Sequence, residues 1–329
     1  MFCTKGISAL LIAILPLLFI FFSGVSAEAQ PQTVSLSIAT GGTGAVFYPL
    51  GGGMARVLSK YIPNMQVTAE VTAGSVDNIK LIQMKKADLA LSMAEIASDA
   101  LHAEGKFKGT GPAPIRTMAA VYSSYLHLVV REGAGIHSLP DLRGKRVSTG
   151  APGSGIEVKN IRVLESYGID VDKHLKRERL NYVEAAGSMK DRKLDAFFIE
   201  GGLPISTVLD LAATPGITIK LINNVEHIDK LRQKYGSCYY KLIIPKGTYS
   251  NINYDVPVVG SGNLLICHEN MDATLVYRII KTLIEHQPEL VLAHKAASDF
   301  SVTTAVVGSP LPFHPGAVKY FKEKGIEVK

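Results

Sequence analysis

The sequence predicts an α/β protein built from two lobes, and three observations support this prediction. The chain of 329 residues is long enough for two domains that share a cleft. A strand, a glycine-rich turn and a helix follow one another at residues 34–61, and the same order of elements recurs at 147–167. Two long runs of β-forming residues, 118–130 and 256–267, are suited to cross between the lobes.

The first unit, residues 34–61, begins with alternating apolar residues that predict a strand and continues through the glycine-rich turn 41–44 into a helix near Val46. Pro49 suits the first helical turn, because proline lacks an N–H that would have no intrahelical partner there. The glycines 51–53 weaken the helix and indicate that another backbone approaches it closely. Apolar residues at helical spacing predict a buried stripe: Leu50, Met54, Val57, Leu58 and Tyr61.

This unit presents backbone N–H groups at the positive end of a helix dipole, which is a general site for a carboxylate or phosphate. Two nucleotide-binding motifs are excluded by spacing. A G-x-G-x-x-G motif needs glycine where Phe47 stands, and a P-loop needs a lysine well before Lys60. A tight turn without a ligand is the alternative, but Thr43, Phe47 and Tyr48 favour a site for something small and anionic.

The rest of the first half alternates strands and helices. Residues 65–71 predict a strand, and the turn that follows leads into a helix with Ser75 as its N-cap and Asn78 near its start. Residues 88–93 predict a short buried strand that ends at Glu95, and the carboxyl end of such a strand is where α/β sheets place ligands.

The second half repeats the architecture, though not the sequence, of the first unit. A strand at 147–149 leads through the glycine turn 150–155 into a helix that ends before Gly168. The remaining predicted strands are 180–183, 195–199 and 239–244, and the remaining predicted helices are 189–194, 205–213, 272–285, 288–297 and 315–325.

Composition indicates a globular protein without nucleic-acid partners. Apolar residues make up 47% of the chain and charged residues 19%, which excludes a disordered chain. The 35 Lys and Arg residues against 29 Asp and Glu leave a formal charge of +6, but the basic residues are scattered and no basic stripe with interleaved aromatics is present. We interpret the charge as a mildly attractive field for anions.

Residues 1–27 predict an export signal that is cleaved near Ala27, and hence a periplasmic protein. Lys5 provides the positive start and an apolar run follows it. A retained membrane anchor is the alternative, although Pro16 interrupts the short run. Two cysteines remain after cleavage, Cys238 and Cys267, and they can pair in an oxidising compartment if the fold brings them close.

Catalysis is not predicted, and neither a metal nor another cofactor is expected. Ser154 follows Gly153, but a nucleophile elbow needs glycine where Pro152 stands, so a hydroxyl that binds a ligand is favoured. The nine histidines show neither an H-E-x-x-H motif nor clustered ligand spacing. Glu95 and Glu200 can form an acid/base pair, but a polar wall of the cleft is the favoured interpretation.

Seven segments in order carry a likeness along nearly all of the mature chain: TGGTGAVFYPLGGGMA (40–55), VTAGSVDNIKLI (71–82), ADLALSMAEIA (87–97), DLRGKRVSTGAPGSG (141–155), LDAFFIEGGLPI (194–205), IPKGTYSNINYDVPVVG (244–260) and FHPGAVKYFKEKGI (313–326). Together they resemble the TAXI-family solute-binding subunits of tripartite (TRAP) transporters. The resemblance implies a periplasmic-binding-protein-like (type II) fold, with two α/β lobes joined by hinge strands around a central cleft.

The resemblance also implies domain limits and a function. Lobe I comprises residues 31–126 with 258–329, and lobe II comprises 127–257, with hinges near 124–130 and 254–260. A monomer is expected to close over a small organic anion or amino acid, either dicarboxylate-like or glutamate-like or a more apolar acid. It then delivers this ligand to a TRAP membrane permease with fused small and large subunits. The alternatives are a ligand sensor for a membrane kinase, a secreted hydrolase or a surface interaction protein.

Carried over motif by motif, the resemblance implies a ligand site with residues from both lobes. Met93 stands where glutamine is usual, Glu95 where aspartate is usual and Ile156 where threonine is usual, which makes the pocket more apolar and less rich in hydroxyl groups. The implied site residues are Thr43, Gly44, Phe47, Tyr48, Ser75, Asn78, Met93 and Glu95 from lobe I, and Ser154, Gly155, Ile156, Gly202 and Pro204 from lobe II.

Overall fold

The strands of the structure form a single sheet. In the described part of this computed structural model, Phe2 and residues 33–328, ten strands are joined. Their order is β2-β1-β3-β10-β4-β7-β5-β6, with β8 paired to β4 and β9 paired to β10. The predicted export signal, apart from Phe2, lies outside the described residues. Among the residues that the structure describes, no helix combines the length and apolar character that crossing a bilayer requires.

Most predicted elements are present within a few residues of their expected limits, while α3, α5, α8, β6 and β8 were not predicted. The helix predicted at 189–194 is wrong, because only its first two residues belong to a helix, the end of α6. The strands are β1 Val34–Ala39, β2 Met65–Glu70, β3 Leu89–Met93, β4 Ile115–Arg131, β5 Arg146–Ser148, β6 Lys176–Glu178, β7 Ala196–Gly201, β8 Ile219–Ile222, β9 Tyr240–Ile244 and β10 Val256–His268. The helices are α1 Phe47–Tyr61, α2 Ser75–Gln83, α3 Ala94–Leu101, α4 Gly155–Ser166, α5 Val171–His174, α6 Tyr182–Lys190, α7 Ser206–Ala213, α8 Ile228–Tyr235, α9 Ala273–Glu285, α10 Gln287–Ala293 and α11 Pro315–Glu323.

Two long strands, β4 and β10, connect the halves of the sheet. In the first half, β1 pairs in parallel with β2 and β3, and β3 pairs with the later residues of β10. In the second half, β5 pairs in parallel with β6 and β7, while the end of β4 pairs with β7 and β8 and the start of β10 pairs with β9. The sheet therefore has two α/β lobes joined by continuous strands. The boundaries and hinges expected near residues 126 and 258 fall inside β4 and β10 and stay predictions.

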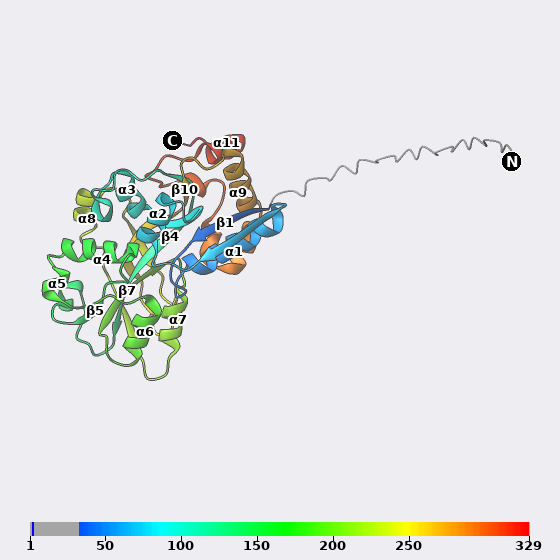
Figure 1. The fold of residues 1–329 in the computed structure, drawn as a ribbon. Coiled ribbons are helices and arrows are strands. Elements are labelled where there is room, and N and C mark those ends of the chain that lie inside the picture. Colours follow the sequence, from blue (N-terminus) through cyan, green and yellow to red (C-terminus); the bar gives the residue numbers. More distant parts are fainter. Residues whose placement is uncertain (1, 3–32, 329) are drawn as a thin grey trace. The chain divides into compact units, whose positions relative to one another are not determined.

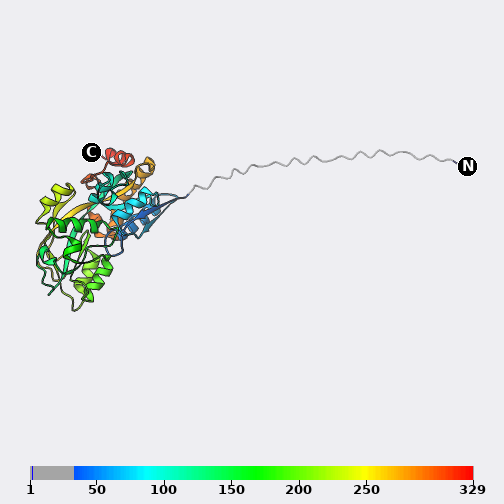
Figure 2. The same ribbon diagram turned by 60° about the vertical axis from the view of Figure 1, so that its left-hand side comes forward.

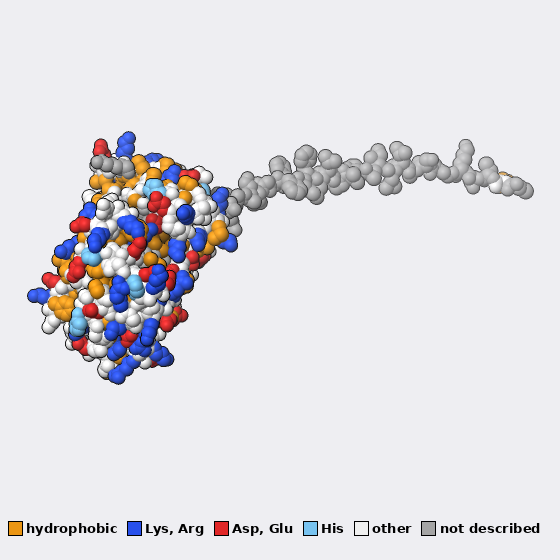
Figure 3. All heavy atoms as spheres, turned by 90° about the vertical axis from the view of Figure 1, so that its left-hand side faces the viewer, with side chains coloured by type: hydrophobic (Ala, Val, Ile, Leu, Met, Phe, Trp, Pro, Cys, Tyr) orange, Lys and Arg blue, Asp and Glu red, His pale blue; other side chains and the backbone are white. Residues whose placement is uncertain are grey.

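The first lobe contains both ends of residues 33–328. Figure 1 shows α1 and β1 beside α9 and α11, whereas α4 to α7 lie together in the other half. The turned view in Figure 2 keeps the blue and red segments together and the green middle of the chain apart from them. On the face that Figure 3 shows, lysine and arginine side chains are interspersed with acidic ones rather than gathered in a stripe.

Helix α1 packs most of its predicted stripe into the first lobe, with Leu50, Met54, Val57 and Leu58 buried. Tyr61 is the exception, because it is 38% exposed and stacks on the ring of His286. The glycines of α1 make room for side chains rather than for another backbone. A methyl group at Gly53 would lie 2.6 Å from the side chain of Ala293 in α10, and one at Gly51 would overlap that of Thr40.

The strand predicted at 180–183 is wrong, because α6 begins there. The side chain of Asn181 accepts hydrogen bonds from the N–H groups of Val183 and Glu184, and Glu184 accepts one from the N–H of Asn181. This capping box satisfies three backbone donors at once, so it overrides the β propensity of the neighbouring residues. The strand of this region, β6, ends at Glu178.

Two further expectations about single residues are corrected. The N-cap of α2 is Gly74, at a φ of +119°, and Ser75 is the first helical residue, whose hydroxyl accepts the N–H of Met93 at 3.1 Å. Cys238 and Cys267 both have free thiols, with Cys267 fully buried in the first lobe. The disulfide that Cys238 and Cys267 could have formed is therefore not present.

Candidate ligand-binding site

A cavity of about 220 Å³ lies between the two lobes. It is lined by four loop segments, 41–47, 72–75, 151–156 and 181–183, together with residues of β3, β4, β7 and β10. One water needs roughly 10–15 Å³ of such space. The cavity is therefore large enough for a small organic molecule.

Four helices begin at this cavity, which are α1, α2, α4 and α6. The first N–H groups of a helix lack intrahelical partners and lie at the positive end of its dipole. At α6 the side chain of Asn181 satisfies two of these groups, and at α4 Ser154 Oγ accepts one from Glu157 at 3.3 Å. The starts of α1 and α2 have no side-chain cap. The N–H of Asp77 in α2 already donates to the carbonyl oxygen of Gly153, and Pro49 in α1 has no N–H. The N–H groups that precede these two residues in the helices are therefore the donors best placed to receive an anion.

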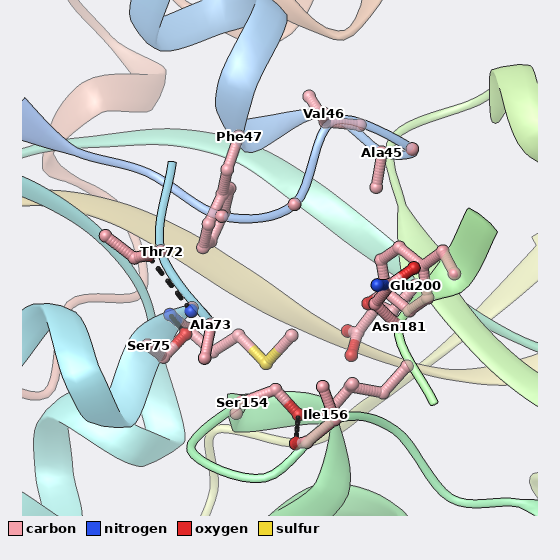
Figure 4. A pocket seen from close by; sticks show the side chains of 18 of the residues that line it. Ala45, Val46, Phe47, Thr72, Ala73, Ser75, Ser154, Ile156, Asn181 and Glu200 are labelled. Carbon is pink, nitrogen blue, oxygen red and sulfur yellow. Dashed lines mark hydrogen bonds between the residues drawn. The ribbon is translucent and has the colours of Figure 1, made fainter. Parts of the chain in front are cut away.

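The walls between these helix starts are largely apolar. Phe47 projects into the cavity and packs edge-on against Tyr122, with 6.4 Å between the ring centroids. Met93 and Ile156 line the same space from β3 and α4. Figure 4 shows Thr72, Ala73 and Ser75 on one side of the cavity, and Glu200 and Asn181 on the opposite side. The cavity thus combines polar ends with an apolar middle.

A buried cluster of charges lies behind the Glu200 side of the cavity. Lys159 of α4 contacts Glu200 Oε1 in β7, and its Nζ lies 2.9 Å from Glu95 Oε1 in α3 and 2.6 Å from Ser261 Oγ in β10. Burial raises the pKa of Glu200 to about 7, and the nearby Glu95 adds to the increase while Lys159 opposes it. Burial acts to lower the pKa of Lys159, but the carboxylates of Glu200 and Glu95 raise it above its usual value.

The lobes touch each other on both sides of the cavity. On one side the N–H of Asp77 donates to the carbonyl oxygen of Gly153 at 3.3 Å, and on the other Thr207 Oγ1 donates to the carbonyl oxygen of Gly44 at 2.6 Å. A methyl group at Gly155 would lie 2.8 Å from Ser75 Oγ, so glycine is needed for this approach. The structure is therefore a closed arrangement of the two lobes.

Comparison with known proteins identifies the family. A model described as the NMT1-like family matches residues 38–325, which include both lobes and every residue that lines the cavity. The chain belongs to the NMT1-like family. The match covers the seven segments used for the sequence resemblance, except Ile326 at the end of the last one, but it does not by itself distinguish the TAXI type.

The fold of this NMT1-like chain is similar to that of solved proteins, one of which is a solute-binding protein. The alkanesulfonate-binding protein of Xanthomonas axonopodis pv. citri, solved bound to MOPS, is 16% identical, with 89% of this chain and 85% of that chain covered and a TM-score of 0.50. A protein of Bordetella bronchiseptica RB50 is 15% identical, with 88% and 89% covered and a TM-score of 0.51. These similarities confirm the expected type II periplasmic-binding-protein fold with its two lobes.

Eight of the thirteen predicted site residues line the cavity of this NMT1-like protein, and Figure 4 labels Phe47, Ser75, Ser154 and Ile156 among them. They come from turns, helix starts and a strand end that are far apart in the sequence, and from both lobes. Whether they contact a ligand stays a prediction. The eight are Thr43, Gly44, Phe47, Ser75, Met93, Ser154, Gly155 and Ile156.

Three predicted residues of the first lobe do not line the cavity. Tyr48 follows Phe47 on α1 and is 36% exposed at the surface. Asn78 is buried, and its amide nitrogen lies 2.5 Å from the carbonyl oxygen of Thr40 and 2.7 Å from that of Leu91, so it ties the residue after β1 to the middle of β3. Glu95 is held behind the cavity wall by Lys159. Asn78 and Glu95 support the site from outside the cavity.

Two predicted residues of the second lobe do not line the cavity either. Gly202 packs against Ala296 and Tyr122 of the first lobe, and a side chain at this position would overlap that of Ala296. Pro204 follows a cis peptide bond and is half-buried. Both lie where the chain leaves β7 for α7. Gly202 therefore lies at the junction between the lobes.

Several lining residues were missed by the sequence analysis. Asn181, Tyr182 and Val183 were hidden by the incorrect strand, although Asn181 and Glu184 have the spacing of a capping box and thus indicate a helix start. Asn263 lines the cavity from β10, where a polar residue interrupts an apolar strand. Tyr122 lines it from β4, and no local pattern distinguishes this tyrosine from a core residue.

Proposed function

We propose that this protein is a periplasmic solute-binding protein of the TAXI type, which captures a small organic anion or amino acid and delivers it to a TRAP membrane permease. The observation that carries the proposal is the cavity between the lobes, at which the uncapped starts of α1 and α2 meet. Uncapped helix starts are suited to a carboxylate. The seven sequence segments support the TAXI type, and the export signal predicted at residues 1–27 supports the compartment.

Binding relies on many contacts together. A helix start stabilises an anion by roughly 0.3–1 kcal/mol when exposed and by about 2 kcal/mol when partly buried, so two helix starts alone do not give tight binding. Hydrogen bonds from N–H groups near Ser75 and Gly155 would add to this. The rings of Phe47 and Tyr122 would pack on the carbon chain of the ligand.

Closure of the lobes couples binding to recognition by the permease. The ion pairs Lys159–Glu95 and Arg162–Asp99 and the hydrogen bond from Thr207 to Gly44 all join one lobe to the other. A ligand held by both lobes would shift the population toward this closed form. The membrane partner would then bind the surface that the closed form presents.

Binding is favoured over catalysis by the surroundings of Ser154. Its hydroxyl donates to the carbonyl oxygen of Ala151 at 2.5 Å and accepts the N–H of Glu157. Among the described residues that line the cavity there is no histidine to serve as a base. The hydroxyl is thus engaged in the local turn and is not activated as a nucleophile.

Calorimetry and thermal unfolding test the proposal. Small molecules extracted from the purified protein, and a panel of organic acids and amino acids, are titrated into ligand-free protein. A ligand at 100 times its Kd should raise the free energy of unfolding by about 2.7 kcal/mol. Absence of any released compound, together with a panel that leaves the melting temperature unchanged, would refute solute binding. Genes for a fused permease beside this gene would favour transport over the sensor alternative.

A further inference from the structure

Two residues that line the cavity each have a buried acceptor oxygen that lacks a hydrogen-bond donor in the described part of the chain. Glu200 is 3% exposed and Asn263 is fully buried, and both line the cavity. Glu200 Oε2 and Asn263 Oδ1 each have no partner among the described residues. Leaving a buried polar atom unsatisfied costs about 1–3 kcal/mol. A group that enters the cavity and donates hydrogen bonds would remove that cost.

The orientation of the Asn263 amide follows from its neighbours. Its Nδ2 lies 3.3 Å from the carbonyl oxygen of Tyr122 and 2.5 Å from Ser124 Oγ. A carbonyl oxygen can only accept a hydrogen bond, so the nitrogen must be the atom that faces Tyr122. The oxygen Oδ1 is therefore the free end of the amide, and it can only accept.

The two free oxygens belong to the same end of the cavity. Ser261 and Asn263 are two residues apart on β10, so their side chains point to the same face and are separated by roughly 6.5 Å. Ser261 Oγ lies 3.5 Å from Glu200 Oε1. Glu200 and Asn263 thus lie close to the same residue, Ser261. Figure 4 shows Glu200 on the opposite side of the cavity from Ser75.

The charges in this region do not balance. Glu95 and Glu200 supply two carboxylates, whereas Lys159 supplies one ammonium group, and all three are buried. Tyr182 of α6 and Tyr122 of β4 also face Glu200 and bring no positive charge. No lysine or arginine is found among the described residues that line the cavity. An unbalanced buried charge is costly, and it is relieved either by a proton, as the raised pKa of Glu200 reflects, or by a cation that joins it.

We propose that Glu200 and Asn263 form a subsite for a protonated nitrogen, so that the ligand is a small zwitterion whose ammonium group lies at Glu200 and whose carboxylate lies at the starts of α1 and α2. This inference rests on the proposed function, because it places the anionic end of the ligand where that function does. It specifies the ligand as an amine-bearing carboxylate and excludes acids, including dicarboxylates, that lack nitrogen.

Matched probes test the subsite by calorimetry. Each amine is compared with its nitrogen-free partner: 3-aminopropanoate with propanoate, 4-aminobutanoate with butanoate, and glutamate with glutarate. In the pair that fits the cavity, the amine should bind at least tenfold more tightly than its partner. Equal or tighter binding of a nitrogen-free acid would overturn the subsite and leave solute binding intact. If neither these probes nor any compound released from the protein binds, both solute binding and the subsite are refuted.

Substitutions at Glu200 and Asn263 test whether these two residues cause the preference for an amine. Glu200→Gln keeps the shape of the side chain and leaves Lys159 paired with Glu95, so the fold should persist and the preference for the amine should disappear. Asn263→Ala removes the second acceptor from a different strand and should reduce the preference at least threefold. Asp195→Asn is the control, because Asp195 pairs with Arg146 and Arg131 away from the cavity. An undiminished preference in folded Glu200→Gln protein would overturn the assignment.

The pH dependence gives a second readout. A cation requires ionised Glu200, whose pKa in the ligand-free protein is about 7, and both Glu95 and Lys159 influence that value. Affinity for the amine should therefore fall as the pH drops from 8 to 5.5, by up to tenfold per unit below 7, and should stay flat in Glu200→Gln. Affinity that rises at low pH in the wild type would show that protonated Glu200 donates to an anion, which contradicts the proposal.

Discussion

Lys159 in the second lobe and Glu95 in the first form an ion pair in the interior of the protein, with 2.9 Å between Nζ and Oε1 and both side chains fully buried. Lys159 also contacts Glu200 of its own lobe. One ammonium group therefore holds the two lobes together at the wall of the cavity. It is also the partner that two buried carboxylates share.

Replacing Lys159 should lower the free energy of unfolding more than removing an exposed ion pair does. Lys159→Met leaves two buried carboxylates without a cation, and breaking a buried pair in this way costs about 3–5 kcal/mol. Urea unfolding at pH 8 should show this loss, and the loss should shrink at pH 5, where the carboxyl group of Glu200, with its pKa raised to about 7, is protonated. Lys193→Met, which removes an exposed pair with Asp191, should change stability by less than about 0.5 kcal/mol. Equal effects of the two substitutions would contradict the role of Lys159.

Gly155 should be required for lobe closure. A methyl group there would lie 2.8 Å from Ser75 Oγ and 2.9 Å from Met93 Sδ, both across the cavity in the first lobe. Gly155→Ala should therefore weaken ligand binding at least tenfold, as measured by calorimetry. Gly187→Ala is the matched control, because Gly187 lies in α6 with no atom within 4 Å of the added methyl, and it should leave affinity unchanged. Full affinity in the Gly155 variant would show that the lobes bind ligand without this contact.

Asn78 should act on stability rather than on direct ligand contact. Its amide nitrogen donates to the carbonyl oxygens of Thr40, just after β1, and of Leu91 in β3, so Asn78→Ala leaves buried acceptors unpaired. We expect a loss of about 1–3 kcal/mol in the free energy of unfolding. Once the variant is folded, ligand affinity should fall less than threefold. A large loss of affinity at unchanged stability would indicate that Asn78 contacts the ligand directly.

His127 should make stability depend on pH below 6.5. Its ring is fully buried on β4, with Nδ1 2.8 Å from the carbonyl oxygen of Tyr125 and Nε2 2.9 Å from the hydroxyl of Tyr249. That hydroxyl also accepts the N–H of Ile205, so it donates to Nε2, and the neutral ring has its proton on Nδ1. Burial lowers the pKa of His127 to about 4.

Because the folded pKa lies below the unfolded value of about 6.5, the unfolded chain binds more protons between pH 4 and 6.5. The contribution of His127 is fully present above pH 6.5 and is lost as the pH falls, by about 2 kcal/mol between pH 7.5 and 5. Urea unfolding of His127→Gln should show a smaller fall over this range than the wild type. His102→Gln, which changes an exposed histidine, should follow the wild type. An unchanged pH profile for His127→Gln would refute this account.

Local sequence patterns were sufficient for most of the fold. The strand, glycine turn and helix of residues 34–61 could be predicted because alternation, glycine and helical spacing are local signals that the packed structure then uses unchanged. The same signals located the loops at 41–47 and 151–156 that line the cavity. Where a local signal was overlooked, as with the capping box of Asn181, the predicted strand was wrong.

By itself, then, the sequence determined the two-lobed α/β fold, the glycine turns and three of the four helix starts at the cavity, those of α1, α2 and α4, because these depend on neighbours in the chain. Only the tertiary structure decided which side chains share that space. Glu95, Lys159 and Glu200 come from three separate elements, and their burial and unequal charges arise only when the lobes close. The same holds for Asn263, whose free oxygen exists because Tyr122 and Ser124, far away in the chain, occupy its amide nitrogen.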